Sequence, residues 1–254
     1  MKLRILGCSG GIGGKLRTTS MLLDHDVLID AGTGLGDLTF EELSQIDHVF
    51  LTHSHLDHVA CLPFMLDTTG GRRSRPVTLY AIEETLEALR QHIFNWKIWP
   101  DFSQIPNRQQ PYMHYQAIKV GETVGLNGRA ITALPANHVV PAVGYQLDSG
   151  SASLVFSGDT TTQDDFWDRV NAIRNLRYLI IETAFPNAEK DLAILSKHLC
   201  PSLLAEDLFK LKQQPEIFIS HLKPDEGELT MQEIKRCADV HVIKMLSNDQ
   251  VFEF

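Results

Sequence analysis

Short apolar runs separated by turn residues recur along the chain and predict a protein rich in β-strands. The predicted strands are Leu3–Leu6, Met21–Leu23, Val27–Ile29, Val49–Leu51, Val77–Tyr80, Ala117–Val120, Ala130–Leu134, Val143–Leu147, Leu154–Phe156, Tyr178–Ile181, Ile217–Ile219 and Val240–Met245. Apolar residues at helical spacing predict helices at Leu38–Ser44, His58–Leu66, Glu83–Ile93, Thr162–Ile173, Pro201–Leu211 and Thr230–Cys237. Strands come in groups with helices between them, so the pattern favours layered sheets and helices over a simple βαβ repeat.

One segment, at about residues 69–115, breaks this regularity. It holds a glycine pair, the arginines Arg72, Arg73 and Arg75, and the aromatic stretch from Phe94 to Phe102. A segment of this kind is often a lid or a pocket wall, and just as often an exposed insertion held by a few aromatic side chains. We interpret it as an irregular insertion within a single domain that spans the whole chain.

The composition indicates a globular protein with a sizeable core, because 43% of the 254 residues are hydrophobic and 22% are charged. The formal net charge of −9 disfavours a general nucleic-acid binder, since affinity for a phosphate backbone needs a basic surface. The chain opens directly on a strand pattern without a secretory signal, and no apolar run approaches membrane-spanning length. The four cysteines are far apart and suit a reducing compartment, so we expect a cytoplasmic protein with no membrane partner.

The clearest chemical signal is the run from His53 to His58, which follows the apolar residues Val49–Leu51. His53 and His55 lie two residues apart, so in an extended segment both side chains point the same way and can bind one ion. Asp57 and His58 follow and can reach a second ion. Imidazole nitrogens with carboxylate oxygens suit zinc, with Mn²⁺ or Fe²⁺ as alternatives when carboxylates bridge.

One cluster cannot complete two coordination spheres, so further ligands must come from distant sequence. Three side chains stand directly after apolar runs: His138, Asp159 and His221. Singly, each has a simpler interpretation as a surface residue, a satisfied core residue or a turn with a helix cap. Together with the first cluster they predict a site for two divalent metal ions.

These residues resemble the metallo-β-lactamase superfamily, whose central motif the run His53 to His58 matches. The resemblance implies an αββα sandwich, with two mixed β-sheets flanked by helices and the metals at one edge. It also implies that His53, His55 and His138 hold the first ion, that Asp57, His58 and His221 hold the second, and that Asp159 bridges them with a hydroxide.

Two further features take their meaning from the same resemblance. Asp30 matches a position that supports the metal ligands, although a strand-end turn residue explains it nearly as well. The glycines from Gly7 to Gly14 lack the lysine and spacing of a phosphate-binding loop, so we interpret them as a flexible loop near the site.

Segments from Ile98–Phe102 and from Ile181 to Pro224 resemble class II 3′,5′-cyclic nucleotide phosphodiesterases. The resemblance implies hydrolysis of a small phosphodiester to a 5′-monophosphate through the metal-bridging hydroxide, and suggests a homodimer. Asp57, Glu182 and His198 are then the candidate catalytic residues, with His198 as a general acid oriented by Glu182.

Trp99 and Phe102 are candidate substrate-binding residues, because their flat rings suit stacking on a base. They could as readily be core residues.

The main alternative function is a tRNA 3′-end-processing endonuclease of the same fold, for which Arg72, Arg73 and Arg75 would contact phosphates. Such an arginine run is more often a solvated turn, and the net acidity counts against this function. A third alternative is a non-catalytic metal-binding module.

Overall fold

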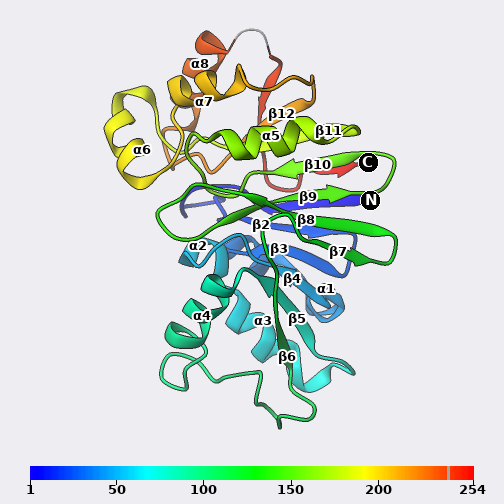
Figure 1. Cartoon of the computed structure of the whole chain (residues 1–254). Coiled ribbons are helices and arrows are strands. Elements are labelled where there is room, and N and C mark those ends of the chain that lie inside the picture. The colour runs from blue at the N-terminus through cyan, green and yellow to red at the C-terminus, as the bar shows by residue number, and fades with distance from the viewer. Residues whose placement is uncertain (239–240) are drawn as a thin grey trace.

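Two mixed seven-stranded β-sheets pack face to face, and helices cover the outer face of each sheet (Figure 1). The computed structural model describes residues 1–238 and 241–254. The first sheet has the order β14 (Val251–Glu253), β1 (Lys2–Gly7), β2 (Ser20–Leu23), β3 (Val27–Ala31), β4 (His48–Phe50), β5 (Val77–Ala81) and β6 (Met113–Ala117). The second has the order β13 (Ile243–Met245), β12 (Glu216–Ser220), β11 (Leu176–Glu182), β10 (Ser153–Phe156), β9 (Val143–Asp148), β8 (Arg129–Pro135) and β7 (Thr123–Leu126). This arrangement confirms the predicted αββα sandwich of two mixed sheets.

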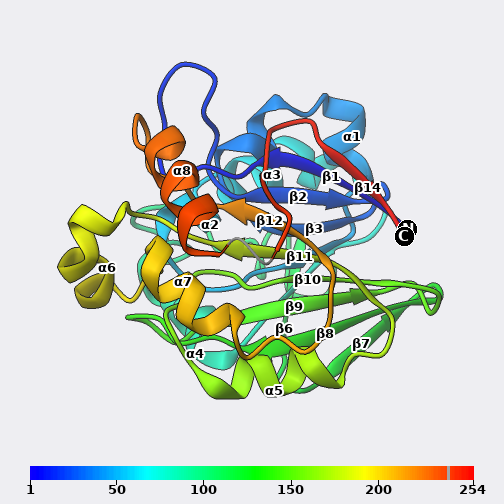
Figure 2. The same ribbon diagram turned by 90° about the horizontal axis from the view of Figure 1, so that it is seen from above.

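The helices divide between the two outer faces. The first sheet is covered by α1 (Phe40–Gln45), α3 (Leu62–Thr69) and α4 (Glu83–His92), and the second by α5 (Asp164–Ala172), α7 (Pro201–Leu208) and α8 (Gly227–Cys237). Two short helices, α2 (Leu56–Val59) and α6 (Lys190–Ser196), lie on the side of the molecule opposite the N- and C-termini (Figures 1 and 2). Single 3₁₀ turns cover Thr33–Asp37, Gly70–Arg72 and Asn187–Glu189.

Both faces of each sheet are buried, which explains why the strands read as continuous apolar runs rather than alternating ones. In β3, Val27 and Ile29 face the core between the sheets, whereas Leu28 faces the helices. In β10, Leu154 and Phe156 likewise face the other sheet, while the intervening residue packs under α5 and α7.

Strand direction brings many strand ends to one edge of the sandwich. β3 to β6 are parallel to one another, and so are β10 to β13. β8 and β10 are both antiparallel to β9, so they too run in the same direction. Residues that directly follow β4, β8, β10 and β12 are therefore well placed to meet at one edge, which is where the sequence predicts the metal ligands.

Several predicted elements differ in their bounds. The helix predicted at His58–Leu66 is two helices, α2 and α3, because Pro63 has no N–H to donate and instead occupies the first turn of α3. The strand predicted at Ala117–Val120 is wrong: β6 ends at Ala117, and a turn with Gly121 at φ +84° follows.

Helix α6 and the edge strands β7 and β14 were not predicted. Residue 240 of the strand predicted at Val240–Met245 lies outside the described residues, and β13 covers the last three positions. The segment at about 69–115 is less irregular than predicted, because it supplies β5, α4 and β6, and irregular chain is confined mainly to residues 93–112.

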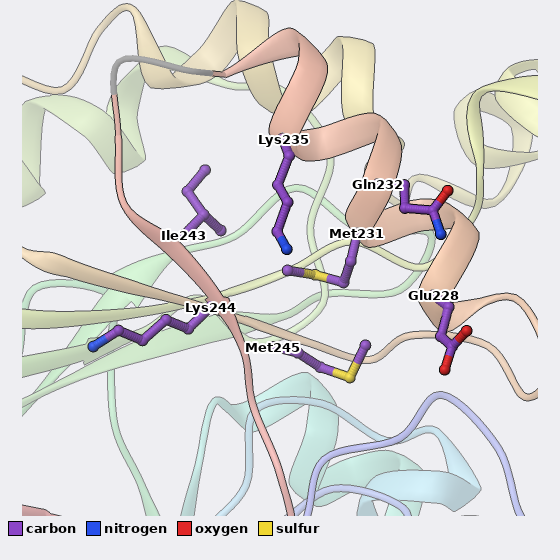
Figure 3. A pocket seen from close by; sticks show the side chains of 7 residues that line it. All are labelled: Glu228, Met231, Gln232, Lys235, Ile243, Lys244 and Met245. Atoms are coloured by element: carbon purple, nitrogen blue, oxygen red, sulfur yellow. The ribbon is translucent and has the colours of Figure 1, made fainter.

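A pocket of about 380 Å³ lies between α8 and β13, at the edge of the second sheet (Figure 3). Met231 from α8 and Met245 from β13 line it, and none of the predicted site residues does. Among the described residues, no helix combines the length and apolar character needed to cross a membrane.

Candidate metal centre

The run from His53 to His58 leaves the end of β4 and enters α2. His53 and His58 are fully buried, whereas His55, the residue that caps α2, and Asp57 are partly exposed. The bend into α2 turns Asp57 and His58 away from the extended segment that carries the first two histidines, so the four side chains form two pairs.

The three distant candidates lie at the same edge, each after a strand of the second sheet. His138 follows β8, Asp159 follows β10 and His221 follows β12. All three are buried, with exposed fractions of 6%, 2% and 2%. His221 has a φ of +62°, a left-handed conformation that is uncommon for a residue with a side chain and that turns the chain sharply after β12.

The ligand atoms form two groups that share Asp159. One group is His53, His55, His138 and Asp159, and the other is Asp57, His58, Asp159 and His221; within each group the atoms lie within 4.8 Å of one another. The His138 Nε2 to His55 Nδ1 distance is 3.2 Å, and the Asp159 Oδ2 to His58 Nε2 distance is 3.3 Å. Ligands about 2.0–2.1 Å from a tetrahedral zinc ion lie roughly 3.3–3.5 Å apart, so these separations suit a common ion.

Three buried ring nitrogens support this interpretation. His53 Nε2, His58 Nε2 and His221 Nδ1 have no hydrogen-bond partner among the described residues. A buried polar atom without a partner is costly, and here all three nitrogens belong to the two ligand groups. The residues therefore fit a pair of divalent ions.

Hydrogen bonds to the opposite ring nitrogens set which nitrogen of each histidine is free. Asp30 Oδ2 accepts from His58 Nδ1 at 2.7 Å and from the hydroxyl of Thr52 at 2.8 Å. The Lys197 carbonyl accepts from His138 Nδ1 at 3.1 Å. Each bond leaves the Nε2 atom available, the arrangement usual for histidine ligands of metals.

Two of these supporting residues have strained backbones. Asp30 has a φ of +55° and Lys197 a φ of +52°. A left-handed residue with a side chain costs on the order of 1 kcal/mol, and such strain gathers where function requires a particular geometry. The support from Lys197 comes from a backbone carbonyl and has no sequence signal, whereas Thr52 could have been suspected from its place next to His53.

The protonation of three of the candidate histidines also suits metal binding, whereas at His58 burial is outweighed by Asp159 and Asp30, which raise the pKa well above its usual value. Burial lowers the pKa of His138 to about 4 and that of His221 to about 3, and it holds the pKa of His53 well below its usual value. These rings are therefore neutral near pH 7, which is the form that binds metals. Burial by itself would raise the pKa of Asp159. The electrostatic interactions with His221 and His58 outweigh burial and hold the pKa of this carboxyl well below its usual range.

Glu182 and His198 form a buried pair beside the two groups. Glu182, the last residue of β11, accepts from His198 Nδ1 at 2.7 Å, from the Thr160 N–H at 3.0 Å and from the Leu199 N–H at 3.3 Å. Burial raises the pKa of Glu182, and although burial opposes a charge on His198, Glu182 raises the pKa of His198. The His198 ring lies 4.9 Å from that of His138, measured between centroids.

The two predicted stacking residues differ in their surroundings. Phe102 is 2% exposed and packs in the core with Phe94 and Tyr112, so the prediction that its ring stacks on a substrate is wrong. Phe94 is buried in the same core, whereas Trp96 is 60% exposed. Trp99 is partly exposed and packs edge-on against Phe64 at 5.2 Å.

The arginine run lies away from the ligand groups. Arg73 and Arg75 both form ion pairs with Asp47, which precedes β4, while the metal ligands follow that strand at its other end. The guanidinium of Arg72 lies 4.9 Å from the Phe40 ring centroid. These contacts give the run a structural role that tethers the segment to α1 and β4.

The glycine-rich segment after β1 contacts the metal-ligand segment directly. The Gly10 N–H donates to the Leu222 carbonyl at 3.0 Å, and the His221 N–H donates to the Cys8 carbonyl at 2.7 Å. A Cβ on Gly10 would lie 2.5 Å from the His221 carbonyl oxygen and 2.9 Å from its ring Cδ2 atom. The base of this loop is thus fixed against His221, and only residues 12–16 are well exposed. Close approach explains why a glycine stands at position 10.

Residues 25–240 match the β-lactamase superfamily domain. The chain belongs to the metallo-β-lactamase superfamily. The computed fold agrees: the crystal structure of unliganded yeast PDE1 superimposes with a TM-score of 0.81, covering 98% of each chain at 16% sequence identity. The run from His53 to His58 stands at a strand end of the first sheet, opposite three candidate ligands from the second sheet.

Two curated relatives are similar in sequence. A probable 3′,5′-cyclic-nucleotide phosphodiesterase from Yersinia pestis is 27% identical over 228 residues, which cover 78% of this chain and 64% of that protein. A ribonuclease Z from Staphylococcus epidermidis is 29% identical over 168 residues, which cover 59% of this chain and 50% of that protein. The chain thus has a metallo-β-lactamase fold, phosphodiesterase and ribonuclease relatives and a candidate metal site, and its alignments span less than two thirds of either relative.

Proposed function

We propose that the protein is a metal-dependent phosphodiesterase that hydrolyses 3′,5′-cyclic nucleotides to 5′-monophosphates. The observation that carries the proposal is the pair of ligand groups sharing Asp159, with the buried Glu182–His198 pair beside them. Two divalent ions bound there, which we propose to be zinc, would act as Lewis acids on the phosphate and activate a water.

The residues of the chain then have distinct tasks. The first group would hold one ion through His53, His55 and His138, and the second through Asp57, His58 and His221, with Asp159 shared. A carboxylate bound to a cation accepts a proton less readily than an unbound one, so we assign Asp57, in one ligand group, and Asp159, shared by both, to metal binding rather than to proton transfer.

His198 is the residue that we assign to proton transfer. Its Nδ1 atom is bonded to Glu182, which fixes the ring orientation and favours the protonated form. The Nε2–H of that ring would donate a proton to the 3′-oxygen as its bond to phosphorus breaks. Among the described residues, the Glu182 carboxylate accepts hydrogen bonds from His198 and from two backbone N–H groups, so we assign it as a positioning residue.

The charge of the protein favours a small substrate over a long polyanion. The net charge of −9 and the structural use of Arg73 and Arg75 leave no evident basic track for a long polyanion next to the ligand groups in the described part of the chain. A small phosphodiester avoids this difficulty because it engages the metals themselves. Trp99, which is partly exposed, is the remaining candidate for base stacking.

A tRNA 3′-end-processing endonuclease is the second candidate, favoured by the similarity to ribonuclease Z. The experiment compares steady-state turnover of cyclic AMP, cyclic GMP and a precursor tRNA with a 3′ trailer by the zinc-loaded protein, with and without chelator. Turnover of a cyclic nucleotide that chelator abolishes would support the proposal. Efficient trailer removal with negligible cyclic nucleotide turnover would establish the endonuclease, and tight metal binding without turnover of any phosphodiester would indicate a metal-binding module.

Two further expectations concern the cellular location and the oligomeric state of the protein. We propose a cytoplasmic location, testable by cell fractionation, and a homodimer, testable by light scattering of the purified protein. Neither is needed for the chemistry of the ligand groups.

A further inference from the structure

Lys223 is a half-buried cation on the same segment as the metal ligand His221. Its backbone N–H donates to the Ala184 carbonyl at 3.2 Å, which attaches the segment to the chain leaving β11. Its ammonium nitrogen donates to the Gly10 carbonyl at 2.9 Å. Gly10 in turn contacts the His221 ring, so the ammonium group lies beside the second ligand group.

The same ammonium group and the His198 ring both lie near the Phe185 ring. The ammonium nitrogen is 5.5 Å from the centroid of the Phe185 ring, and the His198 ring is 5.8 Å from that centroid. Lys223 and His198 therefore share Phe185 as a neighbour, and the charge of Lys223 acts to lower the pKa of His198.

No carboxylate neutralises this cation. Among the described residues, no Asp or Glu oxygen lies within 4.0 Å of the Lys223 ammonium, whereas Arg73 and Arg129 each form ion pairs with aspartates. Within the described part of the chain, the ammonium group donates a hydrogen bond only to the uncharged Gly10 carbonyl. An ammonium has three N–H donors, so two remain for another partner.

A half-buried cation beside the candidate metal centre, with no ion-pair partner among the described residues, is available to bind an anion. We propose that Lys223 is a phosphate-binding residue: its ammonium group binds a non-bridging oxygen of the substrate phosphate, and the Gly10 carbonyl holds it in position. The inference rests on the proposed function only in taking a phosphodiester as the substrate class. A charge-assisted hydrogen bond to an anion is worth enough to change affinity about 10- to 100-fold.

The competing interpretation is mechanical. The bond from Lys223 to Gly10 could serve only to tie the glycine-rich segment to the metal-ligand segment. Two substitutions separate these roles: Lys223→Met removes both the charge and the donor, whereas Lys223→Gln removes the charge and keeps N–H donors for the Gly10 carbonyl. Lys212→Met is the matched control, because Lys212 is exposed and lies before β12, at the end of that strand opposite His221.

The probe is inorganic phosphate, titrated into the zinc-loaded protein by calorimetry, so the result does not depend on turnover of any nucleotide. We expect Lys223→Met and Lys223→Gln each to weaken phosphate binding about 10- to 100-fold, with two ions per chain and an unchanged unfolding temperature, and Lys212→Met to match the wild type. If Lys223→Gln bound phosphate with wild-type affinity, the proposal would be overturned, and Lys223 would serve only to tie the two segments together. The proposal would also be overturned if the variants lost bound metal and that loss accounted for their weaker phosphate binding. Failure of cyclic nucleotide hydrolysis with this phosphate result intact would count against the proposed substrate alone.

Discussion

Gly10→Ala is the substitution whose effect can be worked out most fully from the structure. The added Cβ would lie 2.5 Å from the His221 carbonyl oxygen, and ordinary contact begins at 3.4 Å, so the two segments must separate by about 0.9 Å. Neither segment can move freely, because the Gly10 N–H is bonded to the Leu222 carbonyl and the His221 N–H to the Cys8 carbonyl.

The displacement should weaken metal binding mainly in the second ligand group, which contains His221. Overpacking of this kind destabilises a protein by about 1–3 kcal/mol. Displacement of groups that orient metal ligands typically weakens metal binding about 10- to 100-fold. We therefore expect one zinc ion, held by the group that contains His138, to bind with wild-type affinity, and the ion held by the group that contains His221 to bind 10- to 100-fold more weakly.

The assay is calorimetric titration of zinc into chelator-treated protein, with metal content measured after dialysis. Gly125→Ala is the matched control, because a Cβ there meets nothing within 4 Å and the residue lies in the edge strand β7. Two ions bound to Gly10→Ala with wild-type affinity would refute the reasoning. Equal weakening of both ions would also refute it, since the loss would then reflect the protein as a whole.

Three other substitutions test separate parts of the structure. Asp159→Ala should leave a folded protein with reduced zinc content and little phosphodiesterase activity; two retained ions with full turnover would contradict its assignment as the shared ligand. His198→Ala should keep both ions and lose roughly 10²- to 10⁴-fold in kcat, and loss of metal in that variant would instead make it a ligand or a structural residue. Arg129→Met should destabilise the protein by on the order of 3 kcal/mol near pH 7, measured by urea unfolding, because it leaves Asp26 buried without its partner. The hydrogen bonds from Arg129 lower the pKa of Asp26 from 3.8, so the stability difference between Arg129→Met and the wild type should be complete above about pH 4 and shrink as pH falls through the lowered value; a pH-independent difference would contradict this.

The candidate ligand positions could be proposed from the sequence because each follows an apolar run, and strand ends are easily read from sequence. Strand direction then brings His138, Asp159 and His221 to one edge, a consequence of topology rather than of local pattern. The sandwich of two mixed sheets is implied by the resemblance to the metallo-β-lactamase superfamily, whereas the apolar runs by themselves indicate only layered sheets and helices.

Other features could not be predicted because they depend on packing. Phe102 and Trp99 look alike in sequence, yet one is enclosed in the core and the other reaches the surface. The contact between Gly10 and His221 joins residues more than two hundred positions apart, and the carbonyl of Lys197 has no side-chain signature at all. The split of the predicted helix at Pro63 could have been foreseen, since proline favours a first turn.

The two ligand groups have a consequence for how the protein assembles. In each group two ligands follow a strand of the first sheet and two follow strands of the second, with Asp159 counted in both. Neither half of the chain carries a complete site, so an ion can bind fully only after the two sheets have packed. Metal uptake would therefore be a late step of maturation that reports a correctly closed sandwich, and a zinc ion once bound would resist separation of the two layers.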